Sequence, residues 1–284
     1  MSLGRIVNRL MNRFGYAVAK IPPRHDLPEM QTDVLVDRLR NELAETAARE
    51  MNEFLPDLSL KAVDLRTMID DFYSLFNRRP IQDNQGGSGF QSMFWLYLVT
   101  RCLDPRFIVE SGVWRGQSSW LFRQVCPEAE MHCFDISLDR LEVKDASIHF
   151  HERDWMERET IAPEAENSLI FFDCHVNQGL RIHQAYQRGF RYLLLDDNVP
   201  ADTIYFDGTP ALPSVNMIMD PEISDGMVLN WTFNGKPRSF TYKDKDTHGA
   251  ADLIEYWHRL PNVAPRCGYP GLSYLSVVRL RSQG

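Results

Sequence analysis

The middle of the chain alternates between short apolar runs and segments with helical periodicity. Short apolar runs bounded by turn residues are typical of buried strands. Such strands are expected at 107–110, 131–135, 148–151, 168–173 and 192–196. Helices are expected between them, near Ser118–Val125 and Gln178–Arg188. This alternation predicts an α/β fold with a Rossmann-like, doubly wound and mostly parallel sheet.

The segments on either side of this region have other patterns. Residues 30–76 carry apolar residues at near-helical spacing, interrupted at Pro56, and a strongly apolar helix is expected at 91–103. From about residue 227 the pattern favours a hairpin. A helix at Ala250–Arg259 and an antiparallel C-terminal strand at Tyr274–Leu280 are expected to end the chain.

Three parts of the chain follow from these patterns. Residues 1–23 contain a basic amphipathic helix, 24–90 form an N-terminal helical extension with a polar loop, and 91–284 form the Rossmann-like domain. The helix at 1–20 fits either docking on protein or weak contact with an anionic membrane surface. The loop Asn77–Phe90 fits either a lid over a ligand or a linker.

Composition excludes some classes of function. The formal net charge is −8, which argues against binding nucleic acid through a basic surface. No apolar run approaches the length of a membrane span, and no secretory signal pattern opens the chain. The five cysteines are scattered without a CxxC pair, which favours reduced thiols and a cytoplasmic protein. This composition is also compatible with a homo-oligomer.

The segment FIVESGVWRGQSS, residues 107–119, carries the most chemical information. It predicts a strand that ends at Glu110, a turn containing Gly112 and Gly116, and a helix that opens near Ser118. The free N–H groups at a helix start favour a polar or negatively charged ligand group. In doubly wound folds this arrangement holds nucleotide-like cofactors.

Acidic residues follow the later strands at the same edge of the expected sheet. Asp135 lies about twenty residues beyond the glycine loop, where a carboxylate can accept hydrogen bonds from ribose hydroxyls. An N-cap or turn is the alternative role for Asp135. Asp154 and Trp155 fit an adenine contact, or equally a capping carboxylate beside a buried ring.

A second group of polar residues follows the fourth and fifth strands. Asp173, Asp196, Asp197 and Asn198 offer the carboxylate and amide oxygens that Mg²⁺ or another divalent cation prefers. Adjacent carboxylates repel one another unless a cation or protons intervene. The alternative is that some of them only cap helices or turns.

The residues around the glycine loop resemble those of class I S-adenosylmethionine-dependent methyltransferases. ESGVWRG, residues 110–116, looks like the ETGVWRG form of macrocin-type sugar O-methyltransferases. A glycine is usual where this chain has Trp114, so the Trp114 side chain is expected to point away from the cofactor. FFD (171–173) and LLLDDNV (193–199) are similar to the metal-binding segments of catechol O-methyltransferase.

The resemblance implies a Mg²⁺-assisted O-methyltransferase that acts on a small-molecule or saccharide acceptor. S-adenosylmethionine would be bound by residues of the glycine loop and of the two following strand ends: Glu110, Gly112, Gly116, Ser118, Asp135, Asp154 and Trp155. Asp173 and Asp197 would hold the metal, with Asp196 and Asn198 competing for the third position. Asp173 is accordingly expected to take part in catalysis.

The catalytic base is less well defined by the resemblance. The catechol enzymes place a lysine where this chain has Val176. His175 is the nearest replacement and His183 the next, because imidazole takes protons near neutral pH.

Two other functions remain as alternatives to a methyltransferase. One is a non-catalytic cofactor-binding or scaffold protein, and the other is a nicotinamide-dependent oxidoreductase.

Overall fold

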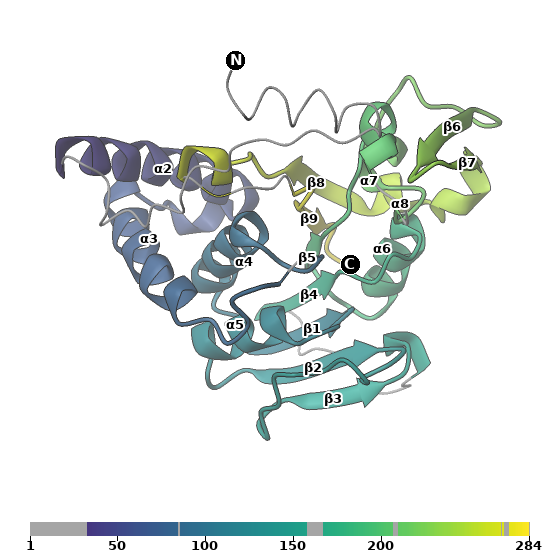
Figure 1. Ribbon diagram of the computed structural model, residues 1–284. Helices are drawn as coiled ribbons and strands as arrows, with labels where there is room; N and C mark the ends of the chain where they lie inside the picture. Colours follow the sequence, from purple (N-terminus) through teal and green to yellow (C-terminus); the bar gives the residue numbers. More distant parts are fainter. Residues whose placement is uncertain are drawn as a thin grey trace, which may run out of the picture.

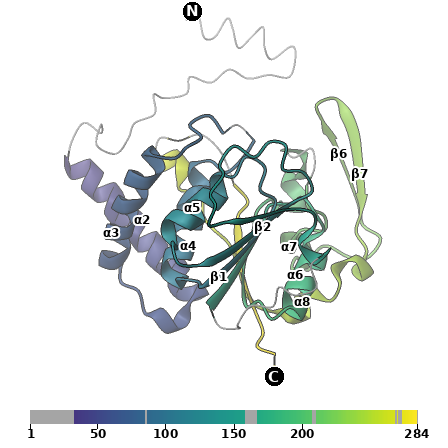
Figure 2. The same cartoon turned by 90° about the horizontal axis from the view of Figure 1, so that it is seen from below.

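The computed structural model describes residues 33–84, 86–157, 167–206, 210–267, 269 and 273–283. Within these residues a seven-stranded sheet lies between two layers of helices (Figures 1 and 2). The amphipathic helix expected at residues 1–20 lies outside the described residues.

The sheet has the strand order β3-β2-β1-β4-β5-β9-β8. Its strands are β1 (Phe107–Ser111), β2 (Glu130–Asp135), β3 (His149–Glu152), β4 (Ser168–Phe172), β5 (Tyr192–Leu195), β8 (Ile254–Arg259) and β9 (Ser276–Leu280). β1 to β5 are parallel, and β9 pairs antiparallel with β5 and with β8. The predicted α/β, mostly parallel sheet with an antiparallel C-terminal strand is therefore confirmed.

Successive side chains of the central strands enter two different cores. Ile108 packs in the core on one face of the sheet, and Val109 packs in the core on the other. In β4, Leu169 and Phe171 lie in the first core, while Ile170 lies in the second. Side chains alternate between the two faces along a strand. Because helices cover both faces, apolar side chains are needed at every position, and these strands appear as continuous apolar runs in the sequence.

Helices of the N-terminal half cover one face of the sheet and later helices cover the other (Figure 2). The first set is α2 (Asp33–Phe54), α3 (Ala62–Asn77), α4 (Phe90–Leu103) and α5 (Gln117–Val125). The second set is α6 (Gln178–Gln187), α7 (Val215–Ile218) and α8 (Ala250–Leu253). The first set shares one continuous core with the sheet, so the helical extension packs directly on the Rossmann-like domain.

Shorter elements complete the chain. A separate hairpin consists of β6 (Val228–Phe233) and β7 (Lys236–Thr241), as the sequence predicts, and it stands beside α7 and α8 in Figure 2. The 3-10 turns are η3 (Pro56–Leu58), η4 (Trp155–Glu157), η6 (Ala201–Phe206), η7 (Asp244–Thr247) and η8 (Ala264–Cys267). Among the described residues, no helix is long and apolar enough to cross a membrane.

The helix predicted at Ala250–Arg259 is wrong over most of its length. Only 250–253 are helical, and 254–259 form the edge strand β8. Pairing with β9, which joins Trp257 to Val278 and Arg259 to Ser276, extends the sheet by one strand. Ile254, Tyr256 and Trp257 favour a strand by intrinsic preference, and the exposed hydrogen-bonding edge of β9 decided the outcome.

Candidate functional site

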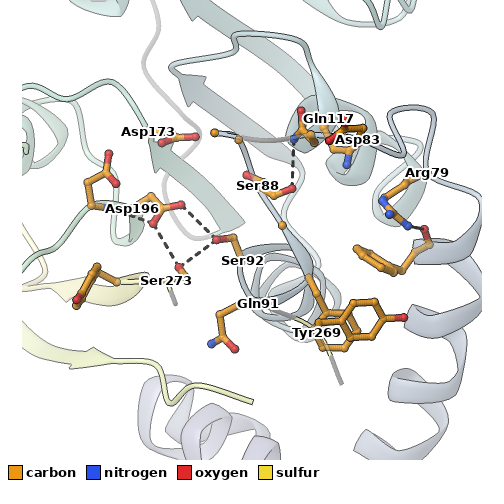
Figure 3. A pocket seen from close by; sticks show the side chains of 18 of the residues that line it. Arg79, Asp83, Ser88, Gln91, Ser92, Gln117, Asp173, Asp196, Tyr269 and Ser273 are labelled. Atoms are coloured by element: carbon orange, nitrogen blue, oxygen red, sulfur yellow. Dashed lines mark hydrogen bonds between the residues drawn. The ribbon is translucent and has the colours of Figure 1, made fainter. Parts of the chain in front are cut away.

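Two cavities adjoin at the carboxyl ends of the parallel strands. The first, about 370 Å³ in volume, lies over the glycine loop and is called here the glycine-loop cavity. The second, about 520 Å³, lies beside the N-terminus of α4 and is called the α4 cavity (Figure 3). Gly86, Gly87, Asp173 and His175 line both cavities. Because the strand order reverses between β1 and β4, this is where doubly wound folds bind ligands.

Gly112 lies where the backbones of β1 and β4 come closest after the strands end. Its φ is +101°, and a Cβ atom there would lie 2.2 Å from the carbonyl oxygen of Asp173. Its N–H donates to the carbonyl oxygen of Phe134 at 2.8 Å. Only glycine fits this position, so the predicted turn is formed and opens the glycine-loop cavity. Gly116, with φ of +87°, then begins α5 as its N-cap residue.

Trp114 lies in the same turn with a φ of +47°, which is unusual for a bulky residue. Its ring packs on the loop before α4, where a Cβ atom on Gly87 would lie 2.6 Å from the ring. Trp114 also lines the glycine-loop cavity. The side chain thus covers the rim of the site, whereas the sequence had suggested that it points away.

Glu110 is fully buried beneath the glycine loop. Its two carboxylate oxygens accept hydrogen bonds from the hydroxyls of Ser118 and Ser119 in the first turn of α5. Burial raises the pKa of Glu110 to about 7, against the opposing effect of these hydroxyls. Neither Glu110 nor Ser118 lines either cavity, and together they join β1 to α5, while the cofactor contact expected of them stays a prediction.

Asp135 holds the glycine loop from the end of β2. Its Oδ2 atom accepts the backbone N–H groups of Val113 at 2.8 Å and Trp114 at 2.9 Å. Asp135 also lines the glycine-loop cavity. The turn role that the sequence left open is therefore formed, and the contact with ribose hydroxyls stays a prediction.

Asp154 forms a two-point ion pair with Arg181 of α6. Asp154 Oδ1 lies 3.1 Å from Nη1, and Oδ2 accepts from Nη2. Both residues line the glycine-loop cavity. The ion pair lowers the pKa of Asp154, although burial acts in the opposite direction. Arg181 was missed from the sequence because its role depends on a partner 27 residues away.

Trp155 does not reach the cavity. It is fully buried and contacts Phe172 and Phe190 edge to face. This placement matches the alternative of a buried ring beside Asp154, while the adenine contact stays a prediction.

Asp173 and Asp196 follow neighbouring parallel strands and line the α4 cavity (Figure 3). Burial, and then the charges of Asp196 and Asp197, raise the pKa of Asp173 well above its ordinary value. Burial and then the charge of Asp197 raise the pKa of Asp196 to about 7. Asp196 accepts hydrogen bonds of 3.4 Å from Ser92 of α4 and from Ser273. No local pattern signals Ser92 and Ser273, which lie 181 residues apart in the chain.

Asp197 faces His175 across the junction of the two cavities. Its Oδ2 atom lies 2.8 Å from Nδ1 of His175, and both residues line the α4 cavity. His183, the other candidate base, contacts His248 and lines neither of the two cavities. The structure thus brings one of the two candidate histidines to the site.

Asn198 turns into the core. It is fully buried, its amide donates to Ser276 at 2.6 Å, and its Oδ1 accepts the N–H of Asn216 at 2.8 Å. Its amide oxygen therefore points away from the acidic residues. Between the two candidates for the third metal position, the arrangement favours Asp196.

The four-residue metal site predicted from the sequence is not formed in this arrangement. The described part of the chain contains no group of three or more His, Cys, Asp or Glu side chains placed to hold a metal ion. Asp173 and Asp196 remain as two half-buried carboxylates with raised pKa values. Both carboxylates line the α4 cavity.

Comparison with solved structures finds O-methyltransferases. The chain is similar to the O-methyltransferase from Bacillus cereus in complex with SAH, at 14% identity and a TM-score of 0.40, covering 84% of this chain and 99% of that one. It is similar to the O-methyltransferase TomG from Streptomyces achromogenes in complex with SAM, at 12% identity and a TM-score of 0.37, covering 99% of both chains.

A third similar structure is the apo form of CmcI, at 20% identity and a TM-score of 0.36. That match covers 42% of this chain and spans 56% of CmcI. No family model and no curated protein matches the chain. All three identities lie below 25%, and all three TM-scores lie below 0.5.

Proposed function

We propose that this protein transfers a methyl group from S-adenosylmethionine to a hydroxyl group of a small-molecule or saccharide acceptor. The observation that carries the proposal is the junction of the two cavities at Asp173 and His175. A methyl donor in the glycine-loop cavity and an acceptor in the α4 cavity would meet at that junction. Holding two reactants in a near-attack arrangement removes the entropic cost of bringing them together from the barrier to such a displacement.

The glycine-loop cavity fits the cofactor in shape and charge. Gly112 leaves open a space that any side chain would close, and Asp135 provides a carboxylate at the position expected for ribose hydroxyls. When bound, S-adenosylmethionine supplies a methyl group on a positively charged sulfur atom. Asp173, which lines the same cavity, contributes negative charge on the side of the junction when it is ionised.

His175 is proposed as the base that takes the acceptor's hydroxyl proton. In the tautomer with a proton on Nδ1, His175 presents this nitrogen to the Asp197 carboxylate, 2.8 Å away, and Nε2 carries the basic lone pair. Asp197 then fixes the orientation of the ring and stabilises the imidazolium that forms, as an orienting carboxylate does in catalytic triads. The acceptor oxygen would gain the methyl group as the bond from that group to sulfur breaks, and the hydroxyl proton would pass to Nε2, so the positive charge of the sulfonium ends on the imidazolium.

We further propose that a magnesium ion assists the reaction. Asp173 and Asp196 would hold the ion, and its charge would offset the repulsion that raises their pKa values. When bound, the ion would lower the pKa of the acceptor hydroxyl. Asp197 is turned toward His175 in this arrangement, so the base and the proposed ion-binding pair are distinct groups.

Two measurements test the proposal. Isothermal titration with S-adenosylmethionine, compared with NADH, tests the cofactor; tighter binding of NADH would favour an oxidoreductase. Release of S-adenosylhomocysteine from a panel of hydroxylated acceptors tests the reaction. Cofactor binding without turnover of any acceptor would favour a non-catalytic binding protein.

A further inference from the structure

Ser88 is a buried polar residue in the α4 cavity that the proposed reaction does not use. Only 6% of its surface is exposed, and it lines the cavity (Figure 3). Among the described residues, no group forms a hydrogen bond with its Oγ atom. A buried hydroxyl without a partner is unfavourable, so such a group in a cavity indicates a site for a ligand atom.

The N-terminus of α4 lies beside Ser88. Gly89 is the N-cap residue, and no side chain caps the helix. The first N–H groups of a helix have no partner within it, and they favour an electron-rich ligand atom. Gly89, Phe90 and Gln91 line the α4 cavity together with Ser88. Two independent features therefore point to the same part of the cavity.

The segment that carries Ser88 is held in place by the glycine loop. Gln117 of α5 exchanges two hydrogen bonds of 3.1 Å with the backbone of Ile81. Arg115 donates to the carbonyl oxygen of Asp83 at 2.7 Å, and Asn84 Nδ2 donates to the carbonyl oxygen of Ser88 at 3.3 Å. These bonds fix the position of the segment relative to the junction of the cavities.

Charged side chains of both signs line the α4 cavity, which favours a neutral ligand group there. Arg79 and Asp83 both line the α4 cavity and carry opposite charges. Asp83 opposes an added negative charge, whereas a hydroxyl group can both donate and accept in this environment. The junction with His175 and Asp197 belongs to the same cavity, so we assign both places to one acceptor molecule.

We propose that Ser88 and the N-terminus of α4 bind a second hydroxyl group of the acceptor, so that Ser88 selects acceptors with two hydroxyls. This inference rests on the proposed methyl transfer, because it assigns the α4 cavity to the acceptor. A site built to hydrogen-bond a substrate hydroxyl discriminates against analogues that lack it, since its own polar group is then left unpaired.

The test uses three probes that differ in one group: cis-1,2-cyclohexanediol, cyclohexanol and cis-2-hydroxycyclohexanecarboxylate. Binding to the full-length protein is measured by thermal shift, with and without S-adenosylhomocysteine. The wild-type protein is expected to bind the diol about fivefold to tenfold more tightly than cyclohexanol. Ser88→Ala should remove this preference, and Ser88→Thr should restore it. Ser74→Ala, at an exposed position of α3, is the control that should leave it unchanged.

Three outcomes would overturn the inference. The first is a wild-type protein that binds the diol and cyclohexanol equally, and the second is Ser88→Ala with the preference intact. The third is a preference for the hydroxy acid that depends on Ser88, which would replace the second hydroxyl by a carboxylate.

A stability measurement separates this role from a structural one. Because Ser88 Oγ has no described protein partner, Ser88→Ala should leave the melting temperature unchanged or raise it. A clear decrease would assign Ser88 to the fold and contradict the inference. Failure of the proposed function is recognised separately, as absence of both S-adenosylmethionine binding and S-adenosylhomocysteine release in the wild-type protein.

Discussion

His175 Nδ1 lies 2.8 Å from Asp197 Oδ2, although the two residues follow different strands of the sheet. Both adopt left-handed backbone conformations, with φ of +50° and +53°. Such conformations are costly for residues other than glycine, and they concentrate at functional sites where the surroundings hold them in place. The pair stands at the junction of the glycine-loop cavity and the α4 cavity.

Replacing His175 tests its role as the base. His175→Ala is expected to lower kcat by about 100-fold or more, because general base catalysis contributes at least that much in most enzymes. The affinity for S-adenosylmethionine should change little. Asp197→Asn should also lower kcat, because the carboxylate that orients the ring is lost. Both values are obtained from S-adenosylhomocysteine release and isothermal titration.

His183→Ala is the matched control for this experiment. His183 contacts His248 and lines neither of the two cavities, so its loss should leave kcat within about twofold of wild type. Equal losses in the two histidine variants would contradict the assignment of the base.

A methyl group at Gly112 is expected to disrupt the fold locally. Gly112→Ala places Cβ 2.2 Å from the carbonyl oxygen of Asp173, so the backbone of β1 or β4 must move. We expect a loss of at least about 4 kcal/mol in the free energy of unfolding, or failure to fold. Denaturant unfolding measures this quantity.

Gly189→Ala separates the effect of crowding from that of backbone conformation. Gly189 has a similar φ, +82°, but nothing lies within 4 Å of an added Cβ. Only the left-handed conformation should be penalised there, at about 1–2 kcal/mol. If the two alanine variants lose the same stability, the close approach between Gly112 and Asp173 is unimportant.

Glu110 is expected to make stability fall as pH rises. Its pKa is about 7 in the folded protein, above the ordinary 4.5, because of burial. The folded state therefore holds a proton that the unfolded state has lost between these values, and stability decreases over that interval. Relative to alkaline pH, the protonated Glu110 carboxyl contributes about 3 kcal/mol to the free energy of unfolding below pH 4.5. This contribution is lost as the pH rises to about 7.

Glu110→Gln isolates this contribution from those of Asp173 and Asp196, which act in the same direction. The difference in free energy of unfolding between wild type and variant should shift in favour of the variant from pH 5 to pH 8. Denaturant titrations at several pH values provide the comparison. A difference that does not vary with pH would refute the prediction.

Magnesium is expected to stabilise the protein at alkaline pH through Asp173 and Asp196. With both carboxylates ionised, a bound cation offsets their repulsion, and stability should rise by about 1.4 kcal/mol at a concentration tenfold above Kd. The same addition to Asp196→Asn should have a smaller effect, and EDTA should reverse the gain. If magnesium does not change the melting temperature of the wild-type protein, the proposed magnesium binding is contradicted.

Much of the fold is determined by local sequence. The apolar runs that became β1, β2, β4 and β5 begin and end within a residue or so of their expected positions. The glycine at position 112 signals the turn in the sequence, and the structure shows that a side chain has no room at this position. The order of strands and helices then defines which strand ends share one edge, so the approach of Asp135, Asp173 and Asp197 follows from topology.

The partners of each side chain are decided only in three dimensions. The sequence suggested Glu110 and Ser118 as cofactor-binding residues and left Trp155 open between an adenine contact and a buried ring, and only packing shows that all three side chains are buried. It could not show that Asn198 turns toward Ser276, or that 254–259 joins the sheet by pairing with β9. Strand periodicity and glycine turns arise from interactions among near neighbours, so they can be read from the chain. Burial, ion pairs such as Asp154–Arg181, and the pairing of His175 with Asp197 depend on residues distant in sequence, and the tertiary structure alone brings them together.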